Sequence, residues 1–259
     1  MPFRTSQEQF DRQAAHYNAQ WNAWNRESLG WLIEHAHCRD SDKWLDVATG
    51  AGFTAVAFAP LVAKVAGVDV SVAMLNEARG RVRAAGLANL VFASGAAETL
   101  PFGTEAFDGV VCRLAAHHFL SVPRFVAEAY RVLRPGGRLL ITDTTGPDDA
   151  PEVDAWHNHV EVLRDGSHVR NYTPGEWCGF VTGAGFALEE WQQVPEPMPI
   201  ILEDWLEKAG CHGPAAAEVR RLFEEAPPDM VRTFAIRQGP DGNISFQWLR
   251  IALSACKPA

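Results

Sequence analysis

Short apolar runs alternate with segments of helical periodicity through the middle of the chain. The apolar runs predict five buried strands, at residues 43–48, 65–69, 90–93, 107–112 and 138–143. Apolar positions recur at helical spacing between them, in residues 53–60, 71–85 and 122–133. Strands that are apolar on both faces and separated by helices are typical of a sheet with helices on both sides. The pattern therefore predicts an α/β fold with a doubly wound, mostly parallel sheet.

The regions on either side of this unit are less regular. Residues 1–42 predict two helices, at 7–20 and 26–37. After residue 143 the pattern predicts helices at 153–164 and 173–183, two further helices within 203–227, and strands at 187–194 and 244–255. We therefore expect a single domain over residues 1–259, with an N-terminal helical arm (1–42), a ligand-binding core (43–145) and a C-terminal half with a helical cap (146–259).

Composition excludes several classes of protein. Of the 259 residues 47% are hydrophobic and 21% are charged, which is typical of a packed globule rather than a disordered chain. The net charge of −9 disfavours nucleic-acid binding, which needs an excess of Lys and Arg. No apolar run reaches the roughly 20 residues of a membrane span, and the first residues lack the apolar core of a signal peptide. We expect neither a nucleic-acid nor a membrane partner.

Five scattered cysteines, an odd number without a Cys-x-x-Cys pair, favour neither a disulfide framework nor a structural zinc site. They are typical of a protein in the reducing cytoplasm. Nine tryptophans are also present. Several of them lie outside the central unit, where a large apolar ring with one N–H donor suits both a core and a pocket wall.

A glycine turn follows the first predicted strand. Gly50 and Gly52 stand between that strand and the helix at 53–60, at the strand end where doubly wound sheets bind ligands. A residue without Cβ lets the backbone approach a ligand closely. The pattern G-x-G-x-x-A, completed by Ala55, also matches a dinucleotide fingerprint. An NAD-dependent oxidoreductase is therefore one interpretation.

Two carboxylates separate the interpretations. Asp69 ends the second strand, 17 residues after Gly52, where a carboxylate accepts hydrogen bonds from ribose hydroxyls in either class of protein. Asp46 lies inside the first strand, where a dehydrogenase has an apolar side chain. A ligand with an ammonium group near the turn explains Asp46.

Five motifs that follow one another along the chain carry a family resemblance. They are Asp46-x-x-x-Gly50-x-Gly52, Val68-Asp69-Val70-Ser71-x-x-Met74-Leu75, Ala97-Glu98-x-Leu100-Pro101-Phe102, Phe107-Asp108 and Val132-Leu133-Arg134-Pro135-Gly136-Gly137. Together they resemble the class I S-adenosylmethionine-dependent methyltransferases, in the branch of the ubiquinone/menaquinone C-methyltransferases. The resemblance covers about residues 10–145. It implies a seven-stranded sheet with an antiparallel last hairpin, and S-adenosyl-L-methionine as cofactor.

The resemblance also implies which residues bind the cofactor. Gly50 and Gly52, with Thr49 beside them, would line the methionine portion, while Asp46 would contact its amino group and Asp69 the ribose. Val70 and Met74 would pack on the adenine, and the backbone at Ala96 and Ala97 would contact its edge. Tyr17 matches an arm that closes over the cofactor carboxylate. Ala96 departs from relatives that have Asp there, so a side-chain hydrogen bond to the adenine amino group is missing.

Candidate catalytic groups follow the fourth predicted strand. His117 and His118 stand at the edge where cofactor and acceptor meet, and imidazole titrates near neutral pH, so either is a candidate base. Adjacent residues point in different directions, so we expect one of them at most to face the pocket. Arg113 is a candidate for contact with the cofactor or an acidic acceptor, and pairing with a helix carboxylate is the alternative.

One further polar pattern is consistent with either a metal site or a solvated helix face. Asp154, His157, Asn158 and Glu161 recur at helical spacing and share one face. We predict no metal site and expect this face to be exposed to solvent.

The sequence thus predicts an S-adenosylmethionine-dependent methyltransferase that transfers a methyl group in line to an O, N, C or S atom of a small, partly apolar molecule. A protein acceptor, an NAD-dependent oxidoreductase and a non-catalytic cofactor-binding protein are the alternatives. The pattern makes no prediction about oligomeric state.

Overall fold

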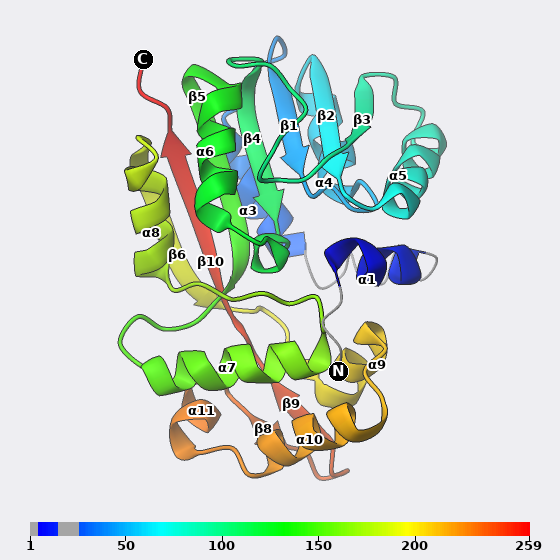
Figure 1. Cartoon of the computed structure of the whole chain (residues 1–259), viewed down its shortest axis with the longest axis vertical. Helices are drawn as coiled ribbons and strands as arrows, with labels where there is room; N and C mark the ends of the chain where they lie inside the picture. The colour runs from blue at the N-terminus through cyan, green and yellow to red at the C-terminus, as the bar shows by residue number, and fades with distance from the viewer. Residues whose placement is uncertain (1–4, 15–25) are drawn as a thin grey trace.

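The computed structural model describes residues 5–14 and 26–259, and its centre is a seven-stranded sheet (Figure 1). The strand order is β3-β2-β1-β4-β5-β10-β6, and β10 runs antiparallel to both of its neighbours. The strands are β1 (Lys43–Val47), β2 (Lys64–Asp69), β3 (Leu90–Ser94), β4 (Phe107–Arg113), β5 (Leu133–Thr145), β6 (Ala187–Pro195) and β10 (Leu249–Cys256). The predicted doubly wound, mostly parallel sheet is confirmed.

Both faces of the sheet are covered because its strands alternate large apolar side chains from face to face. In β1, Trp44 packs against Phe58 on one face, while Leu45 and Val47 belong to the core on the other. Helices α3 and α4 lie behind the sheet in Figure 1, and α6 and α8 lie in front of it. The helices are α3 (Arg26–Ala36), α4 (Phe53–Phe58), α5 (Val72–Ala84), α6 (Val122–Val132) and α8 (Pro174–Gly183), with a 3₁₀ turn after α4 (Ala59–Leu61).

Side-chain caps define where two predicted helices begin. The Ser71 hydroxyl accepts a hydrogen bond from the backbone N–H of Met74, and Gly86 takes a left-handed φ of 65° just after α5. Thr173 and Glu176 form a reciprocal capping box at the start of α8. A hydroxyl that satisfies an unpaired N–H stabilises a helix start by about 1 kcal/mol. The predicted starts at 71 and 173 are confirmed.

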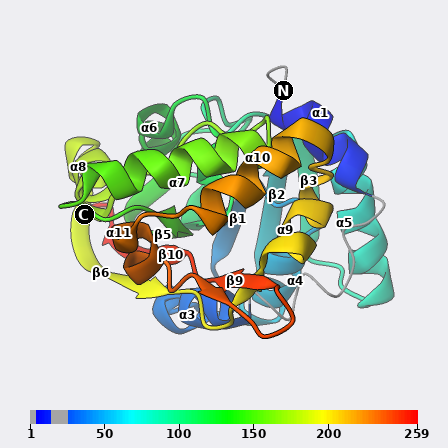
Figure 2. The same cartoon turned by 90° about the horizontal axis from the view of Figure 1, so that it is seen from below.

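A helical cap lies beyond the carboxyl ends of the parallel strands (Figure 2). It consists of α7 (Pro151–Arg164), α9 (Leu202–Ala209), α10 (Gly213–Glu224), α11 (Pro228–Thr233) and a small sheet of β7 (Ile200–Ile201), β9 (Ile244–Phe246) and β8 (Arg237–Gln238). Its separate core is aromatic, with Trp205, Phe223 and Trp248 buried together. The prediction of one strand over 244–255 is wrong, because the segment divides into β9 in the cap and β10 in the large sheet.

The N-terminal helix α1 (Ser6–Gln13) lies between the sheet and the cap (Figure 1). The Ser71 hydroxyl donates to Asp11 Oδ1 at 2.5 Å, which ties α1 to the sheet edge. On the other side, Gln9 Nε2 donates to the carbonyl of Ala209 at 3.2 Å. The expected helix at 7–20 is thus confirmed as far as residue 13, and its remainder lies outside the described residues.

Two further findings concern membrane-spanning helices and the cysteines. Within residues 5–14 and 26–259, no helix has the length and apolar character to cross a membrane. All five cysteines lie in this part of the chain, and their thiols are free.

Candidate active site

The glycine turn between β1 and α4 forms the floor of the candidate site. Gly50 and Gly52 have φ values of 51° and 81°, a region that favours residues without a side chain. A Cβ on Gly52 would lie 2.9 Å from the Cβ of Ala78, whereas a Cβ on Gly50 would meet no atom within 4 Å. Gly52 is therefore required by packing against α5, and Gly50 borders open space.

Asp69 connects the end of β2 to this turn. Its Oδ2 accepts a hydrogen bond from the backbone N–H of Gly50 and its Oδ1 one from the backbone N–H of Ser71, both at 2.8 Å. Burial raises the pKa of Asp69, although these two hydrogen bonds oppose the rise. The carboxylate lines a cavity of about 290 Å³. The acid predicted to bind a ribose thus faces a space large enough for a ligand group.

Asp46 contacts both the turn and the first residues of α4. Its Oδ2 accepts hydrogen bonds from the Thr49 hydroxyl at 2.6 Å and from the backbone N–H of Ala55 at 3.0 Å. Burial raises the pKa of Asp46 to about 7, against the opposing effects of the Thr49 hydrogen bond and the Arg113 charge. A nearby cation would favour the charged form of this carboxylate.

The cavity lies between the sheet edge and α1. Apolar and small side chains dominate its wall, which is made by Thr5, Ser6, Gln7, Phe10, Ala48, Asp69, Val70, Gly95, Ala96, Ala97, Glu98, Ala115, His118, Phe119, Leu120, Ser167 and Val169. Three predicted adenine contacts, Val70, Ala96 and Ala97, are among them. Met74 is instead buried in a small cluster with Ala14 and Ala51. Tyr17, the predicted carboxylate contact, lies outside the described residues.

The loop after β3 that carries Ala96 and Ala97 is held by α6. Arg131 donates from Nη1 to the carbonyl of Phe102 at 2.8 Å and from Nη2 to that of Leu100 at 3.1 Å. Glu128 accepts a hydrogen bond from the backbone N–H of Leu100 at 2.7 Å. These contacts give the Leu-Pro-Phe motif a physical role, because they fix the wall of the cavity from behind.

The two candidate bases lie in a 3₁₀ turn (Ala116–His118) after β4, and His118 faces the cavity. His118 Nδ1 lies 3.1 Å from the carbonyl oxygen of Ser167, and the ring of Phe10 meets its ring edge-on at 5.0 Å. Burial lowers the pKa of His118 to about 4, and the neighbouring His117 charge adds to this effect. His118 is therefore neutral at physiological pH.

His117 has a different environment, created by Asp143 near the end of β5. Its Nδ1 lies 2.6 Å from Asp143 Oδ1, and its backbone N–H donates to Asp143 Oδ2 at 3.0 Å. Burial alone would lower the pKa of His117. The charge of Asp143 and its hydrogen bond act in the other direction, and the pKa of His117 is raised overall. Two adjacent imidazoles thus have opposite protonation preferences.

Comparisons with known proteins show which family the chain belongs to. A model described as a methyltransferase domain matches residues 45–141. The uncharacterized methyltransferase YcgJ of Bacillus subtilis is 34% identical over 254 residues, covering 98% of this chain and 99% of the relative. The chain belongs to the S-adenosylmethionine-dependent methyltransferases. The crystal structure of YcgJ superposes on this methyltransferase with a TM-score of 0.86 at 35% identity, covering 90% of this chain and 99% of that one.

A relative with a named activity is similar to the methyltransferase over a shorter stretch. Demethylmenaquinone methyltransferase of Symbiobacterium thermophilum is 39% identical over 152 residues, which is 54% of this chain and 59% of that protein. Only part of each protein therefore aligns with the other. None of these findings supports the oxidoreductase alternative.

Arg113, at the end of β4 in the methyltransferase, points toward α4. Its Nε donates to the Thr54 hydroxyl at 2.8 Å. Its positive charge also lowers the pKa of Asp46 against the effect of burial. Contact with the cofactor stays a prediction for Arg113.

On the polar face of α7, His157 and Glu161 are buried and Asp154 and Asn158 are half-buried, so the expectation that this face is exposed to solvent is wrong. His157 is 0% exposed and packs against the ring of Trp248 at 4.1 Å, and Glu161 is 6% exposed. Burial lowers the pKa of His157 to about 3 and raises that of Glu161. Among the residues that the structure describes, no group of three or more His, Cys, Asp or Glu side chains is arranged to hold a metal ion.

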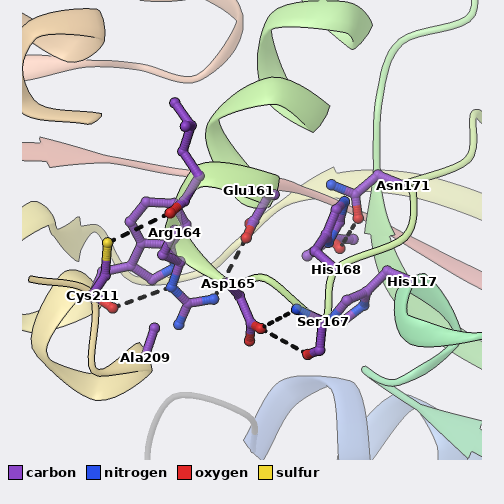
Figure 3. A network of polar contacts seen from close by, with 12 residues as sticks. His117, Glu161, Arg164, Asp165, Ser167, His168, Asn171, Ala209 and Cys211 are labelled. Atoms are coloured by element: carbon purple, nitrogen blue, oxygen red, sulfur yellow. Dashed lines mark hydrogen bonds and ion pairs between the residues drawn. The ribbon is translucent and has the colours of Figure 1, made fainter. Parts of the chain in front are cut away.

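A network of polar contacts joins the end of α7 to the loop that follows it, close to His117 (Figure 3). Asp165 Oδ1 accepts hydrogen bonds from the backbone N–H of Ser167 at 2.9 Å and from its hydroxyl at 2.7 Å. Arg164, at the end of α7, lies 3.5 Å from Glu161 and donates to the carbonyl of Trp205. The loop that follows α7 thus fixes the carbonyl against which His118 rests.

Sequence reasoning missed Asp143, although a signal was present. Like Asp69, Asp143 is an acid near the carboxyl end of its strand, and it follows the apolar run Leu139-Leu140-Ile141. Because β4 and β5 are parallel neighbours, their carboxyl ends meet at one edge of the sheet. The order of the strands therefore brings Asp143 to the turn that carries His117.

Proposed function

We propose that this methyltransferase holds S-adenosylmethionine in the cavity beneath α1 and transfers its methyl group to a small, partly apolar molecule. One observation carries the proposal. Asp69 ends β2, is hydrogen-bonded to the glycine turn, and still lines a cavity of about 290 Å³. An acid at the carboxyl end of the strand next to the one that leads into the glycine turn is suited to a ribose diol.

Residues of the glycine turn and beneath it fit the other parts of the cofactor, although they do not line the cavity themselves. A Cβ at Gly50 would meet no atom within 4 Å, so a methionine chain could pass close to the backbone there. Asp46 is a buried carboxylate with its pKa raised to about 7, and a ligand ammonium group would stabilise its charged form. The proposed cofactor contacts are Tyr17, Asp46, Thr49, Gly50, Gly52, Asp69, Val70, Met74, Ala96, Ala97 and Arg113.

The bound cofactor supplies a methyl group on a positively charged sulfur. The chain has to align the acceptor, exclude water and take up a proton when the acceptor releases one. His118 lines the cavity, and the ring of His117 lies 4.2 Å from that of His118, measured between centroids. We propose that the acceptor binds against this pair of imidazoles.

The wall of the cavity supports a small, partly apolar acceptor. Phe10, Phe119, Leu120 and Val169 contribute apolar surface on the side of the histidines. A net charge of −9 would repel the sugar-phosphate backbone of a nucleic acid, so we propose no nucleic-acid partner. Free thiols at all five cysteines support a cytoplasmic location.

Thermal unfolding with two ligands tests the cofactor. A ligand that binds only the folded state stabilises it by about 2.7 kcal/mol at a concentration 100 times its Kd. We expect S-adenosylhomocysteine to raise the unfolding temperature and NAD to leave it unchanged. The Asp69→Asn variant should lose most of the shift, whereas Asp108→Asn, at the opposite end of the sheet, should keep it. A shift with NAD alone would contradict the proposal.

A transfer assay separates an enzyme from a non-catalytic cofactor-binding protein. Labelled S-adenosylmethionine is incubated with a library of small aromatic and aliphatic acceptors, and label in the products is counted. We expect transfer to a subset of them. A protein that binds S-adenosylhomocysteine but transfers label to no acceptor would be a cofactor-binding protein.

A further inference from the structure

We propose that Glu98 recognises the adenine of the cofactor, with its carboxylate accepting a hydrogen bond from the C6 amino group. This contact selects S-adenosylmethionine against analogues that carry another purine. The inference rests on the proposed function, because it assigns a specificity-determining residue to that cavity. Glu98 lines the cavity together with Ala96 and Ala97, which precede it in the chain.

A tight turn after β3 brings Glu98 to the wall of the cavity. The backbone N–H of Thr99 donates to the carbonyl of Ala96 at 3.2 Å, and these two residues also form an isolated β-bridge. Just before the turn, the backbone N–H of Gly95 donates to the carbonyl of Asp69 at 3.1 Å. The turn that carries Glu98 is thus tied to the strand end that carries the acid proposed for the ribose.

A single hydrogen bond orients the Glu98 carboxylate. Its Oε1 accepts the backbone N–H of Ser121, the residue that caps the start of α6, at 3.2 Å. Within the part of the chain that the structure describes, no donor contacts the second oxygen, Oε2. A carboxylate oxygen accepts hydrogen bonds and donates none. The half-buried side chain is therefore held at one oxygen and keeps the other for a donor group of a ligand.

Glu98 is the side-chain acceptor in the part of the wall proposed to face the adenine. Gly95, Ala96 and Ala97 line the same part and have no polar side chain. Asp69 also lines the cavity, but both of its oxygens accept backbone N–H groups, one of them from the glycine turn. The two acids are therefore suited to different groups of the nucleoside, Asp69 to the sugar and Glu98 to the base.

The substituent at C6 distinguishes adenine from other purines. Adenine carries an amino group there, which donates hydrogen bonds, whereas hypoxanthine and guanine carry a carbonyl oxygen, which accepts them. A carboxylate has no proton to donate, so it pairs with the amino group and repels the carbonyl oxygen. A hydrogen bond to a charged group changes affinity about 10- to 100-fold. A carboxylate in this position therefore discriminates between these rings.

Glu98 also supports the start of α6, and one variant separates the two roles. Glu98→Gln keeps an oxygen that accepts the N–H of Ser121, so its free energy of unfolding should stay close to the native value. With that oxygen engaged, the amide NH₂ takes the place of Oε2. An NH₂ group donates to a carbonyl oxygen and has no acceptor for an amino group.

Calorimetry with the full chain and three ligands tests the contact. The ligands are S-adenosylhomocysteine, S-inosylhomocysteine, which has a carbonyl at C6, and the purine analogue that has hydrogen at C6. We expect the native chain to bind S-adenosylhomocysteine about 10- to 100-fold more tightly than the C6-hydrogen analogue. In Glu98→Gln, the preference for S-adenosylhomocysteine over S-inosylhomocysteine should fall by about tenfold or more, while the affinity for the C6-hydrogen analogue should change little.

A matched control tests whether charge alone explains the result. Glu77→Gln removes a carboxylate from an exposed position on α5 that does not line the cavity, and it should keep the native affinity for all three ligands. A Glu77→Gln protein that loses the preference as Glu98→Gln does would overturn the inference. So would a Glu98→Gln protein that is less stable than the native chain but keeps the native preference, because Glu98 would then serve only the start of α6.

The native chain distinguishes this inference from the proposed function without any variant. If it binds the C6-hydrogen analogue as tightly as S-adenosylhomocysteine, the inference is overturned and the proposed cofactor stands. If it binds none of the three nucleosides, the proposed function is overturned as well.

Discussion

The carboxylate of Asp69 accepts a hydrogen bond from the backbone N–H of Gly50, with 2.8 Å between Oδ2 and the nitrogen. This bond ties the end of β2 to the turn that follows β1. The acid proposed to bind the ribose and the turn proposed to hold the methionine chain therefore form one unit. Changes on either side of this bond should affect cofactor binding together.

Replacement of Asp46 should stabilise the protein and weaken its function. Burial raises the folded-state pKa of Asp46 to about 7, far above its value in an unfolded chain. The stability that this group contributes is complete at acid pH and is lost as the pH rises through 7. Asp46→Asn should therefore raise the free energy of unfolding at pH 8, on the order of 1–4 kcal/mol, with little effect at pH 4.

Urea unfolding at both pH values measures this difference, and calorimetry with S-adenosylhomocysteine measures the loss of affinity. Equal destabilisation of Asp46→Asn at pH 4 and pH 8 would show that its hydrogen bonds to Thr49 and Ala55, rather than its charge, decide the outcome.

The two turn glycines should differ in their tolerance of a methyl group. Gly50→Ala places a side chain in open space, so its cost is the left-handed backbone alone, about 1–2 kcal/mol. Gly52→Ala adds a contact of 2.9 Å between its Cβ and that of Ala78 in α5. We expect Gly52→Ala to lose about 1–3 kcal/mol more in thermal unfolding. Equal losses would show that α5 moves aside freely.

Loss of Arg131 should weaken cofactor binding from a distance. Its guanidinium holds the carbonyls of Leu100 and Phe102, and thereby the loop with Ala96 and Ala97 in the cavity wall. Arg131→Met should lower the affinity for S-adenosylhomocysteine about tenfold, or 1.4 kcal/mol, in calorimetry. Arg138→Met, which removes a surface ion pair with Glu189, is the matched control and should bind normally.

Phe10 should contribute more to cofactor binding than Leu120 in the same wall of the cavity. Phe10 lines the cavity from α1 and meets the ring of His118 at 5.0 Å, whereas Leu120 lines it but is 78% exposed. Truncation of a side chain costs in proportion to the apolar contact that it loses. We expect Phe10→Ala to weaken S-adenosylhomocysteine binding by about 1–2 kcal/mol and Leu120→Ala by less. The reverse order in calorimetry would place the ligand away from α1.

The fold was predictable from sequence where burial is uniform. Strands such as β1 are enclosed on both faces, so their apolar runs marked them to within a few residues. The break between β9 and β10 was not visible in the same way. It arises where the backbone N–H of Gln247 donates to the carbonyl of Phe234 at 2.7 Å and Trp248 enters the cap core. Both contacts depend on distant segments.

The site was predictable where one segment carries it. The glycine turn, Asp46 and Asp69 follow from local spacing, and the structure brings them together. The partnership of His117 with Asp143 depends on β4 lying beside β5. The burial of His157 depends on the cap, because helical spacing shows which residues share a face and not what covers it.

A crystal structure with S-adenosylhomocysteine would show whether the nucleoside lies in the cavity beneath α1. We expect ribose hydroxyls within about 3 Å of the Asp69 carboxylate and the adenine beside Val70 and Ala97. The sulfur should point toward the histidine turn. A nucleoside bound outside this cavity, or a ribose that does not touch Asp69, would contradict this expectation.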